Sequence, residues 1–155
     1  MKFLNYTIAF QELPDEVSLA FVVTGCPRNC PGCHSPEQRG ASGELLTDSL
    51  LSSLINKYKR HITCVLFMGG EFLEDEILRY AGIVRSANLL AGLYSGAESL
   101  PESFFSAFDY IKIGPYNKEL GGLSSPKTNQ RLYRCHDSSH IEDITFKFYE
   151  QATEK

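Results

Sequence analysis

The organisation of the chain follows from one stretch of sequence, VSLAFVVTGCPRNCPGCH, which spans residues 17–34. Its first part is apolar apart from Ser18, a pattern typical of a strand that is buried on both faces of a parallel sheet. Cys26, Cys30 and Cys33 follow in C-x3-C-x2-C spacing. Because α/β folds place their sites at the carboxyl ends of parallel strands, we expect these three sulfurs to form the functional site.

Cysteines this close together favour a metal or an iron–sulfur cluster. A structural zinc site usually draws four ligands from two separated pairs, and the chain has no second pair. Cys64 lies inside an apolar run, and Cys135 lies far along the chain next to His136. A [4Fe-4S] cluster normally has four cysteine ligands, so three would leave one iron open for chemistry. The alternatives are a zinc site that recruits a distant ligand, and a disulfide loop with a spare cysteine.

The composition indicates a single domain that spans residues 1–155. The hydrophobic and charged fractions, 43% and 22%, are ordinary for a globular protein, and the net charge of −4 provides no broad basic face for nucleic acid. No apolar run approaches the roughly 18 residues of a membrane span, and residues 1–11 lack a signal-peptide pattern. We therefore expect a cytoplasmic protein with neither nucleic acid nor a membrane as partner. Its cysteines should be thiols or metal ligands.

Periodicity along the chain predicts an α/β fold. Alternation of apolar and polar residues from Leu4 to Phe10 predicts an edge strand. Further strands are expected at 17–23, 62–68, 89–94 and 110–113, and helices at 46–58, at 74–87 and from Pro101 to Phe108. Strands and helices in this order imply right-handed crossovers and a parallel sheet. The prediction is an incomplete (β/α) barrel, a half-barrel of parallel strands that is open on one side.

The pattern changes after the fourth of these buried strands. Residues 114–142 show no regular periodicity, and an irregular segment of that length inside a compact domain usually has a function. Ile144, Phe146 and Phe148 then alternate with polar residues, which predicts a last half-buried strand.

Two motifs together carry a resemblance to a known family. The cysteine motif after one buried strand and Gly69-Gly70-Glu71 after the next resemble the radical S-adenosylmethionine superfamily. More narrowly, the chain resembles the activating enzymes of anaerobic ribonucleotide reductase over about residues 17–131. The motifs that carry this resemblance are GCPRNCPGCH (25–34), LYSG (93–96), IGPY (113–116) and TNQR (128–131). Two positions depart from the usual patterns: Gly32 replaces an aromatic residue of the superfamily, and Ser35 replaces an asparagine of the activating enzymes.

The resemblance implies an oxidoreductase with two cofactors. Cys26, Cys30 and Cys33 would hold a [4Fe-4S] cluster whose open iron chelates S-adenosylmethionine, and reductive cleavage of that cofactor would yield a 5′-deoxyadenosyl radical. The implied partner is the large subunit of anaerobic ribonucleoside-triphosphate reductase, on which a glycyl radical would form. A reducing protein such as flavodoxin or ferredoxin would supply electrons. No catalytic side chain is expected beyond the cluster and the cofactor.

The resemblance also implies further binding residues. Gly32 would leave room for adenine, His34 would touch its edge, and Glu71 would accept a hydrogen bond from the methionine ammonium group. Each has a structural alternative, such as a plain turn at Glu71 or extension of Lys112 to solvent. The implied cofactor-binding residues are Gly32, His34, Gly69, Gly70, Glu71, Ser95 and Lys112. The implied partner-binding residues, in the segment 114–142, are Asn129, Gln130 and Arg131.

Two other functions remain open at this point. One is activation of a different glycyl-radical enzyme, of the pyruvate formate-lyase type. The other belongs to another class: a noncatalytic binding module that a metal stabilises. The short chain and the motif at 128–131 favour the reductase over the first alternative, and the open iron favours an enzyme over the second.

Overall fold

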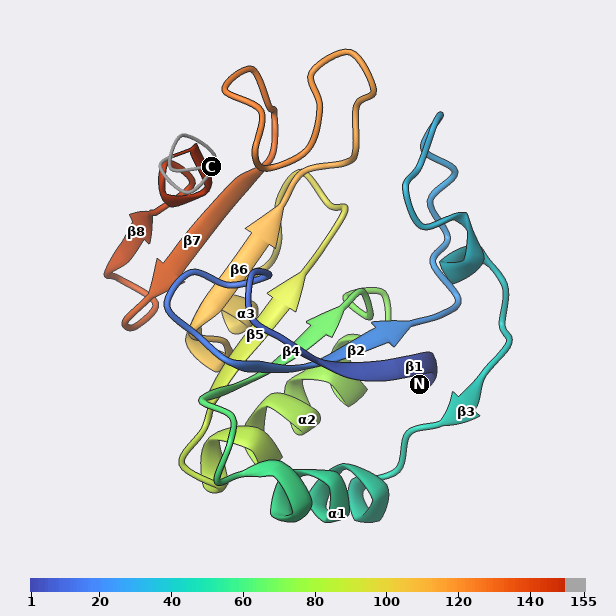
Figure 1. The fold of residues 1–155 in the computed structure, drawn as a ribbon, viewed down its shortest axis with the longest axis vertical. Coiled ribbons are helices and arrows are strands. Elements are labelled where there is room, and N and C mark those ends of the chain that lie inside the picture. Colours follow the sequence, from blue (N-terminus) through green and yellow to red (C-terminus); the bar gives the residue numbers. More distant parts are fainter. Residues whose placement is uncertain (150–155) are drawn as a thin grey trace.

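A computed structural model describes residues 1–149 of the protein. In this part of the chain, eight strands form one sheet in the order β3-β1-β2-β4-β5-β6-β7-β8 (Figure 1). The strands are β1 (Lys2–Ala9), β2 (Ser18–Val23), β3 (Glu44–Leu45), β4 (Cys64–Met68), β5 (Leu90–Tyr94), β6 (Tyr110–Ile113), β7 (Arg131–Cys135) and β8 (Ile141–Asp143). The helices are η1 (Pro36–Arg39), a 3-10 helix, and the α-helices α1 (Asp48–Tyr58), α2 (Glu74–Ser86) and α3 (Glu102–Ala107).

The sheet is mixed, so the predicted half-barrel of parallel strands is wrong. β2, β4, β5 and β6 pair in parallel, as expected for strands joined by helical crossovers. β1 and β3 on one side, and β7 and β8 on the other, are added through antiparallel pairs. β1 reaches β2 through the short connection 10–17, which contains no crossover helix. Such a connection requires antiparallel pairing, whereas the alternation of residues 4–10 specifies a strand without its direction.

The prediction of an irregular segment over 114–142 is also wrong in part, because β7 lies within it and β8 begins in it. In β7 only Leu132 and Cys135 are buried, and charged residues interrupt the alternation. Arg134 is accommodated by an ion pair of 3.7 Å between its Nη1 and Oδ1 of Asp109. The strand expected from Ile144 onward does not form, since β8 ends at Asp143. Its carboxylate caps the turn that follows, accepting hydrogen bonds from the Thr145 backbone N–H and hydroxyl.

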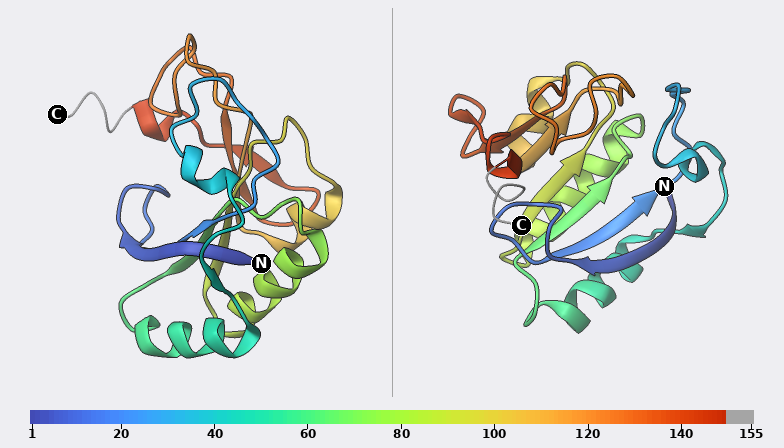
Figure 2. Two further views of the ribbon diagram at one scale, coloured as in Figure 1. Left: turned by 90° about the vertical axis from the view of Figure 1, so that its right-hand side faces the viewer. Right: turned by 45° about the horizontal axis from the view of Figure 1, so that its top comes forward.

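The two faces of the sheet are covered differently. On β4, Val65 and Phe67 face a large core that includes residues of all three α-helices, while Cys64 and Leu66 face a smaller core on the opposite side. In Figure 2 (left) the α-helices lie on one side of the sheet, and the connection 10–17 lies on the other with residues 144–149. Among residues 1–143, none of the three α-helices packs against this second face.

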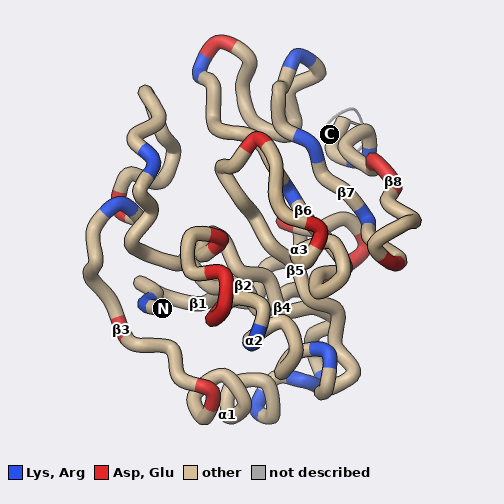
Figure 3. Tube along the Cα trace, turned by 180° about the vertical axis from the view of Figure 1, so that it is seen from behind, with Lys and Arg blue, Asp and Glu red and all other residues tan. Residues whose placement is uncertain are grey.

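Charged residues of both signs are distributed along the described chain. In Figure 3, Lys and Arg positions are interspersed with Asp and Glu positions along the described chain. Within residues 1–149, no helix combines the length and the apolar character that crossing a membrane requires.

Candidate functional site

The parallel strands bring the motifs to one edge of the sheet. β2, β4, β5 and β6 point in one direction (Figure 1), so the segments that follow them lie at the same edge. These segments are the cysteine loop (residues 24–35), Gly69-Gly70-Glu71, Ser95-Gly96 and the chain after Ile113. The sequence prediction of a site at this edge is consistent with the geometry.

The cysteine loop is held by the residues that follow it. The backbone N–H of Cys26 donates to the carbonyl oxygen of Gln38 at 2.9 Å, and that of Cys33 donates to the carbonyl oxygen of Cys30 at 3.2 Å. Arg39 in η1 donates through Nη2 to the same Cys30 carbonyl oxygen at 2.8 Å. Two residues of the short helix η1 therefore hydrogen-bond to the cysteine loop and help to fix the path of the chain between Cys26 and Cys30.

The three loop cysteines are free thiols of intermediate exposure, and all three line one cavity of about 420 Å³. Among residues 1–149, no group of three or more His, Cys, Asp or Glu side chains converges on the position of a single metal ion. In a [4Fe-4S] cluster each cysteine can bind a different iron, so its sulfurs need not converge on one point. A shared cavity is therefore the relevant geometry for a cluster.

The remaining two cysteines lie away from the cavity. Cys64 is fully buried in β4 and Cys135 is 2% exposed in β7. Burial raises the pKa of the Cys64 thiol far above its usual range and that of Cys135 to about 11. Because the thiolate is the metal ligand, both are poor candidates for a cluster.

The charged side chains that line the cavity include those of Arg28, Glu71 and Lys112. Arg28 in the cysteine loop donates through Nε to Oε1 of Glu71 at 3.5 Å, and the Glu71 side chain is only 8% exposed. Lys112 is buried and donates through Nζ to the carbonyl oxygens of Ser95 at 3.4 Å and Gly114 at 3.2 Å. Burial lowers the pKa of Lys112 to about 8, against the opposite effect of nearby Glu71, Cys30 and Cys33. These three residues thus bring two basic side chains and one carboxylate to the lining of the cavity.

Most of the predicted cofactor residues lie around this cavity, namely His34, Gly69, Glu71, Ser95 and Lys112. Gly32 and Gly70 are not among the lining residues. A Cβ at Gly70 would lie 2.8 Å from Sδ of Met1 and 3.3 Å from Cδ1 of Ile77, so this position faces the core. The φ of Gly70 is +107°, a backbone conformation that favours glycine, so the turn alone accounts for glycine at this position.

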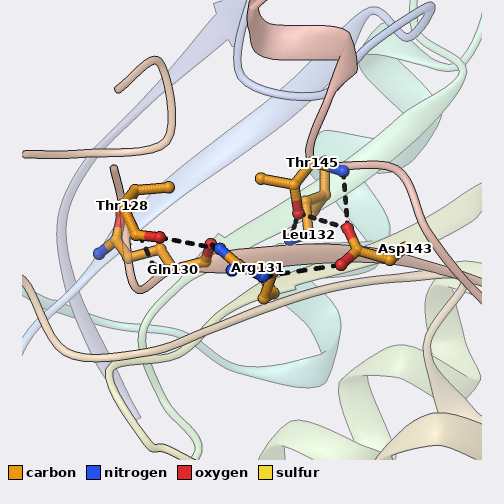
Figure 4. A network of polar contacts seen from close by, with 6 residues as sticks. All are labelled: Thr128, Gln130, Arg131, Leu132, Asp143 and Thr145. Carbon is orange, nitrogen blue, oxygen red and sulfur yellow. Dashed lines mark hydrogen bonds and ion pairs between the residues drawn. The ribbon is translucent and has the colours of Figure 1, made fainter. Parts of the chain in front are cut away.

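The predicted partner residues help to build the loop that contains them. Gln130 is buried, lines the cavity and donates through Nε2 to the Gly114 carbonyl oxygen at 3.3 Å. Arg131 is exposed at the start of β7; its Nη1 donates to the carbonyl oxygens of Thr128 and Gln130 (Figure 4). Its Nε lies 3.7 Å from Oδ2 of Asp143. Of the three, the exposed Asn129 has the simplest structural role, one hydrogen bond to the Pro115 carbonyl oxygen.

Several lining residues escaped the sequence interpretation. Met68 on β4 and Tyr94 on β5 were missed, although they are register partners of the predicted Lys112 on β6 and form one row with it across the sheet. The strand periodicity contained this signal, since each is the last or next-to-last residue of its strand. Tyr116, whose ring centroid lies 4.1 Å from that of His34, connects the cysteine loop to the chain after β6. No sequence pattern marks that contact.

Differences in burial predict which thiols react. In native protein without a cluster, iodoacetamide is expected to modify Cys26, Cys30 and Cys33, whereas Cys64 and Cys135 should react only after unfolding in urea, because both are buried with raised pKa values. Mass spectrometry of peptides after timed alkylation measures each site. Modification of native Cys64 at the rate of Cys30 would contradict the burial shown by the structure.

Comparison with known proteins supports an iron–sulfur site. Residues 16–92 match the family model described as a 4Fe-4S single cluster domain. The comparisons with curated proteins and with solved structures gave no match. The matched range includes β2, the whole cysteine loop and β4, and it ends within β5. An iron–sulfur cluster domain is therefore present in this part of the chain, and it contains the three cysteines that share the cavity.

Proposed function

We propose that this protein is a radical S-adenosylmethionine enzyme that generates a glycyl radical on anaerobic ribonucleoside-triphosphate reductase. One observation carries the proposal: motif residues that are far apart in the sequence line one cavity. Cys26, Cys30 and Cys33 lie in the matched cluster domain, and Glu71 and Lys112 stand beside them. The proposal includes a cytoplasmic location, where the thiols stay reduced, and a reducing protein such as flavodoxin or ferredoxin as electron donor.

The residues of the cavity fit both cofactors. Three thiols are available as cluster ligands, and within the described chain neither Cys64 nor Cys135 lines the cavity to complete a set of four. A volume of about 420 Å³ lies in the range of small-molecule sites, roughly 300–1,000 Å³. Carboxylate, ammonium and hydroxyl groups in its lining complement the charged and polar parts of an amino-acid derivative.

The cluster and S-adenosylmethionine supply, when bound, one-electron cleavage of a carbon–sulfur bond, which yields a radical able to abstract a hydrogen atom. The chain's own residues bind and orient. Glu71 can accept hydrogen bonds from an ammonium group, and Lys112 has a third N–H donor beyond the two it uses. Met68, Tyr94 and Phe148 add apolar surface to the lining, which reduces access of water to the reacting groups.

The direct test is anaerobic incubation of the reconstituted protein with S-adenosylmethionine and dithionite. The expected product is 5′-deoxyadenosine, measured by liquid chromatography, and addition of the reductase should give a glycyl-radical EPR signal. An intact cluster without cleavage would favour a noncatalytic cluster-binding module. A radical formed only on a pyruvate formate-lyase type enzyme would move the assignment to that partner.

The partner assignment of Arg131 has its own test. Arg131→Ala is expected to keep the cluster and the cleavage measured without partner, while glycyl-radical yield falls, because displacement of reacting groups by about 1 Å can cost on the order of a hundredfold in rate. Asp143→Asn is the matched control, since it removes the charge that faces Arg131 but keeps an acceptor for the Thr145 cap. Equal EPR amplitudes in Arg131→Ala and wild type would refute the contact. An equal fall in both variants would show that only the loop structure matters.

A further inference from the structure

The cysteine loop is hydrogen-bonded to the stretch that follows it, residues 38–40. The backbone N–H groups of Gly25 and Cys26 donate to carbonyl oxygens of this stretch, at 2.8 Å and 2.9 Å. The side chain of Gln38 donates through Nε2 to the carbonyl oxygen of Met68, at the end of β4, at 3.2 Å. Residues 38–40 therefore connect the start of the cysteine loop to the sheet through contacts between protein groups alone.

Arg39 brings a positive charge to the middle of the cysteine loop. Its Nη2 donates at 2.8 Å to the carbonyl oxygen of Cys30, which also accepts from the backbone N–H of Cys33. Arg39 lines the same cavity as the three thiols. Arg28, another basic residue of this lining, is paired with Glu71, whereas Arg39 forms no ion pair within residues 1–149. In the described chain, the charge of Arg39 is therefore not neutralised by a carboxylate.

A cation beside the cysteines affects how readily a bound cluster accepts an electron. Each thiolate ligand is negatively charged, and the added electron makes the cluster more negative still. A nearby cation stabilises the more negative state and so raises the reduction potential. The hydrogen bond to Cys30 keeps the Arg39 guanidinium beside the loop. Because Arg39 is also exposed to solvent, its effect should be moderate.

We propose that Arg39 is a positioning residue that holds the loop at Cys30 and favours the reduced state of the cluster. One electron passes from the reductant to the cluster, and no bond is formed or broken in this step. The inference rests on the cluster domain matched at residues 16–92, and not on cleavage of S-adenosylmethionine. It therefore goes beyond the proposed function.

Redox titration of the reconstituted protein with dithionite, followed by EPR of the reduced cluster, tests the effect of the charge. Arg39→Gln is expected to shift the midpoint potential to a more negative value. At a fixed potential, the ratio of reduced to oxidised cluster should fall about two- to tenfold, the range for one hydrogen bond of ordinary strength. Arg39→Lys keeps the charge and should stay within about twofold of wild type. Arg79→Gln, which breaks an exposed pair with Asp48 outside the cavity, is the matched control and should change nothing.

A histidine variant changes the charge within one folded protein. The side chain in Arg39→His is a cation below a pH of about 6.5 and neutral above it. Relative to wild type, its midpoint potential should therefore become more negative as the pH rises from about 6 to about 8. His34 and Lys112 also line the cavity, but both are present in wild type, which corrects for their titration.

Three results would overturn the proposal. The first is an unchanged midpoint potential in Arg39→Gln, and the second is an equal shift in Arg39→Gln and Arg39→Lys. If Arg39→Gln does not retain the cluster, the same pH dependence in Arg39→His and wild type is the third. None of these measurements uses S-adenosylmethionine, so their failure leaves the proposed function intact. A wild-type protein that holds the cluster without cleaving S-adenosylmethionine would refute the proposed function and leave the role of Arg39 intact.

Discussion

Alanine at Cys26, Cys30 or Cys33 is expected to abolish the reconstituted cluster, whereas Cys64→Ala and Cys135→Ala retain it. The first three thiols share one cavity, and loss of any one leaves two irons without a protein ligand. The other two are buried, and their raised pKa values disfavour the thiolate that binds iron. Iron and acid-labile sulfide per chain, with visible absorption of anaerobically reconstituted protein, measure the result.

The buried cysteines are the matched controls in this series, because each change removes one sulfur from the same chain. Circular dichroism of all five variants separates loss of the cluster from loss of the fold. If Cys135→Ala removed the cluster as completely as Cys30→Ala, the three-cysteine site and its open iron would be wrong.

Gly70→Val is expected to destabilise the fold strongly, even in protein without a cluster. A side chain at a φ of +107° costs about 1–3 kcal/mol in backbone strain. Contact with Sδ of Met1 and Cδ1 of Ile77 adds about 1–3 kcal/mol through overpacking. Urea unfolding followed by circular dichroism should therefore show a loss of roughly 2–6 kcal/mol in the free energy of unfolding.

Gly82→Val is the control for this prediction. Gly82 lies in α2, and a Cβ there would meet nothing within 4 Å, so the change should alter the free energy of unfolding by less than about 1 kcal/mol. Similar midpoints for Gly70→Val and wild type would show that the turn after β4 tolerates a side chain. Weakened ligand binding in Gly70→Val would then reflect the cavity rather than the fold.

The central part of the fold could be predicted from the sequence because its signals are local. The apolar runs that become β2, β4, β5 and β6, and the helical spacing of α1 and α2, each lie within one element. The direction of β1 and the existence of β7 and β8 depend on pairing with distant strands. In β7 the charged Arg131 and Arg134 interrupt the apolar alternation by which a strand is recognised in the sequence. They are accommodated by ion pairs and by hydrogen bonds to carbonyl oxygens, and these contacts form only in the folded chain.

The same distinction applies to the candidate site. Cys26, Cys30 and Cys33 could be predicted from their spacing. Glu71 and Ser95 could be predicted from their positions directly after buried strands. Arg28 was not predicted, because its contact with Glu71 depends on how far one loop reaches across two strand ends. The assignments to S-adenosylmethionine and to the reductase came from resemblance, and they stay predictions for the experiments above.

The contact between His34 and Tyr116 has a consequence for the order in which the protein is made. The cysteine loop and the matched range 16–92 leave the ribosome before Lys112, Tyr116 and Gln130, which also line the cavity. A nascent chain that ends before residue 110 lacks these three residues, so part of the lining of the cavity is missing. We expect a cluster that is inserted at that stage to be more sensitive to oxygen than a cluster in the complete chain. The later protection would come from residues that are not cluster ligands.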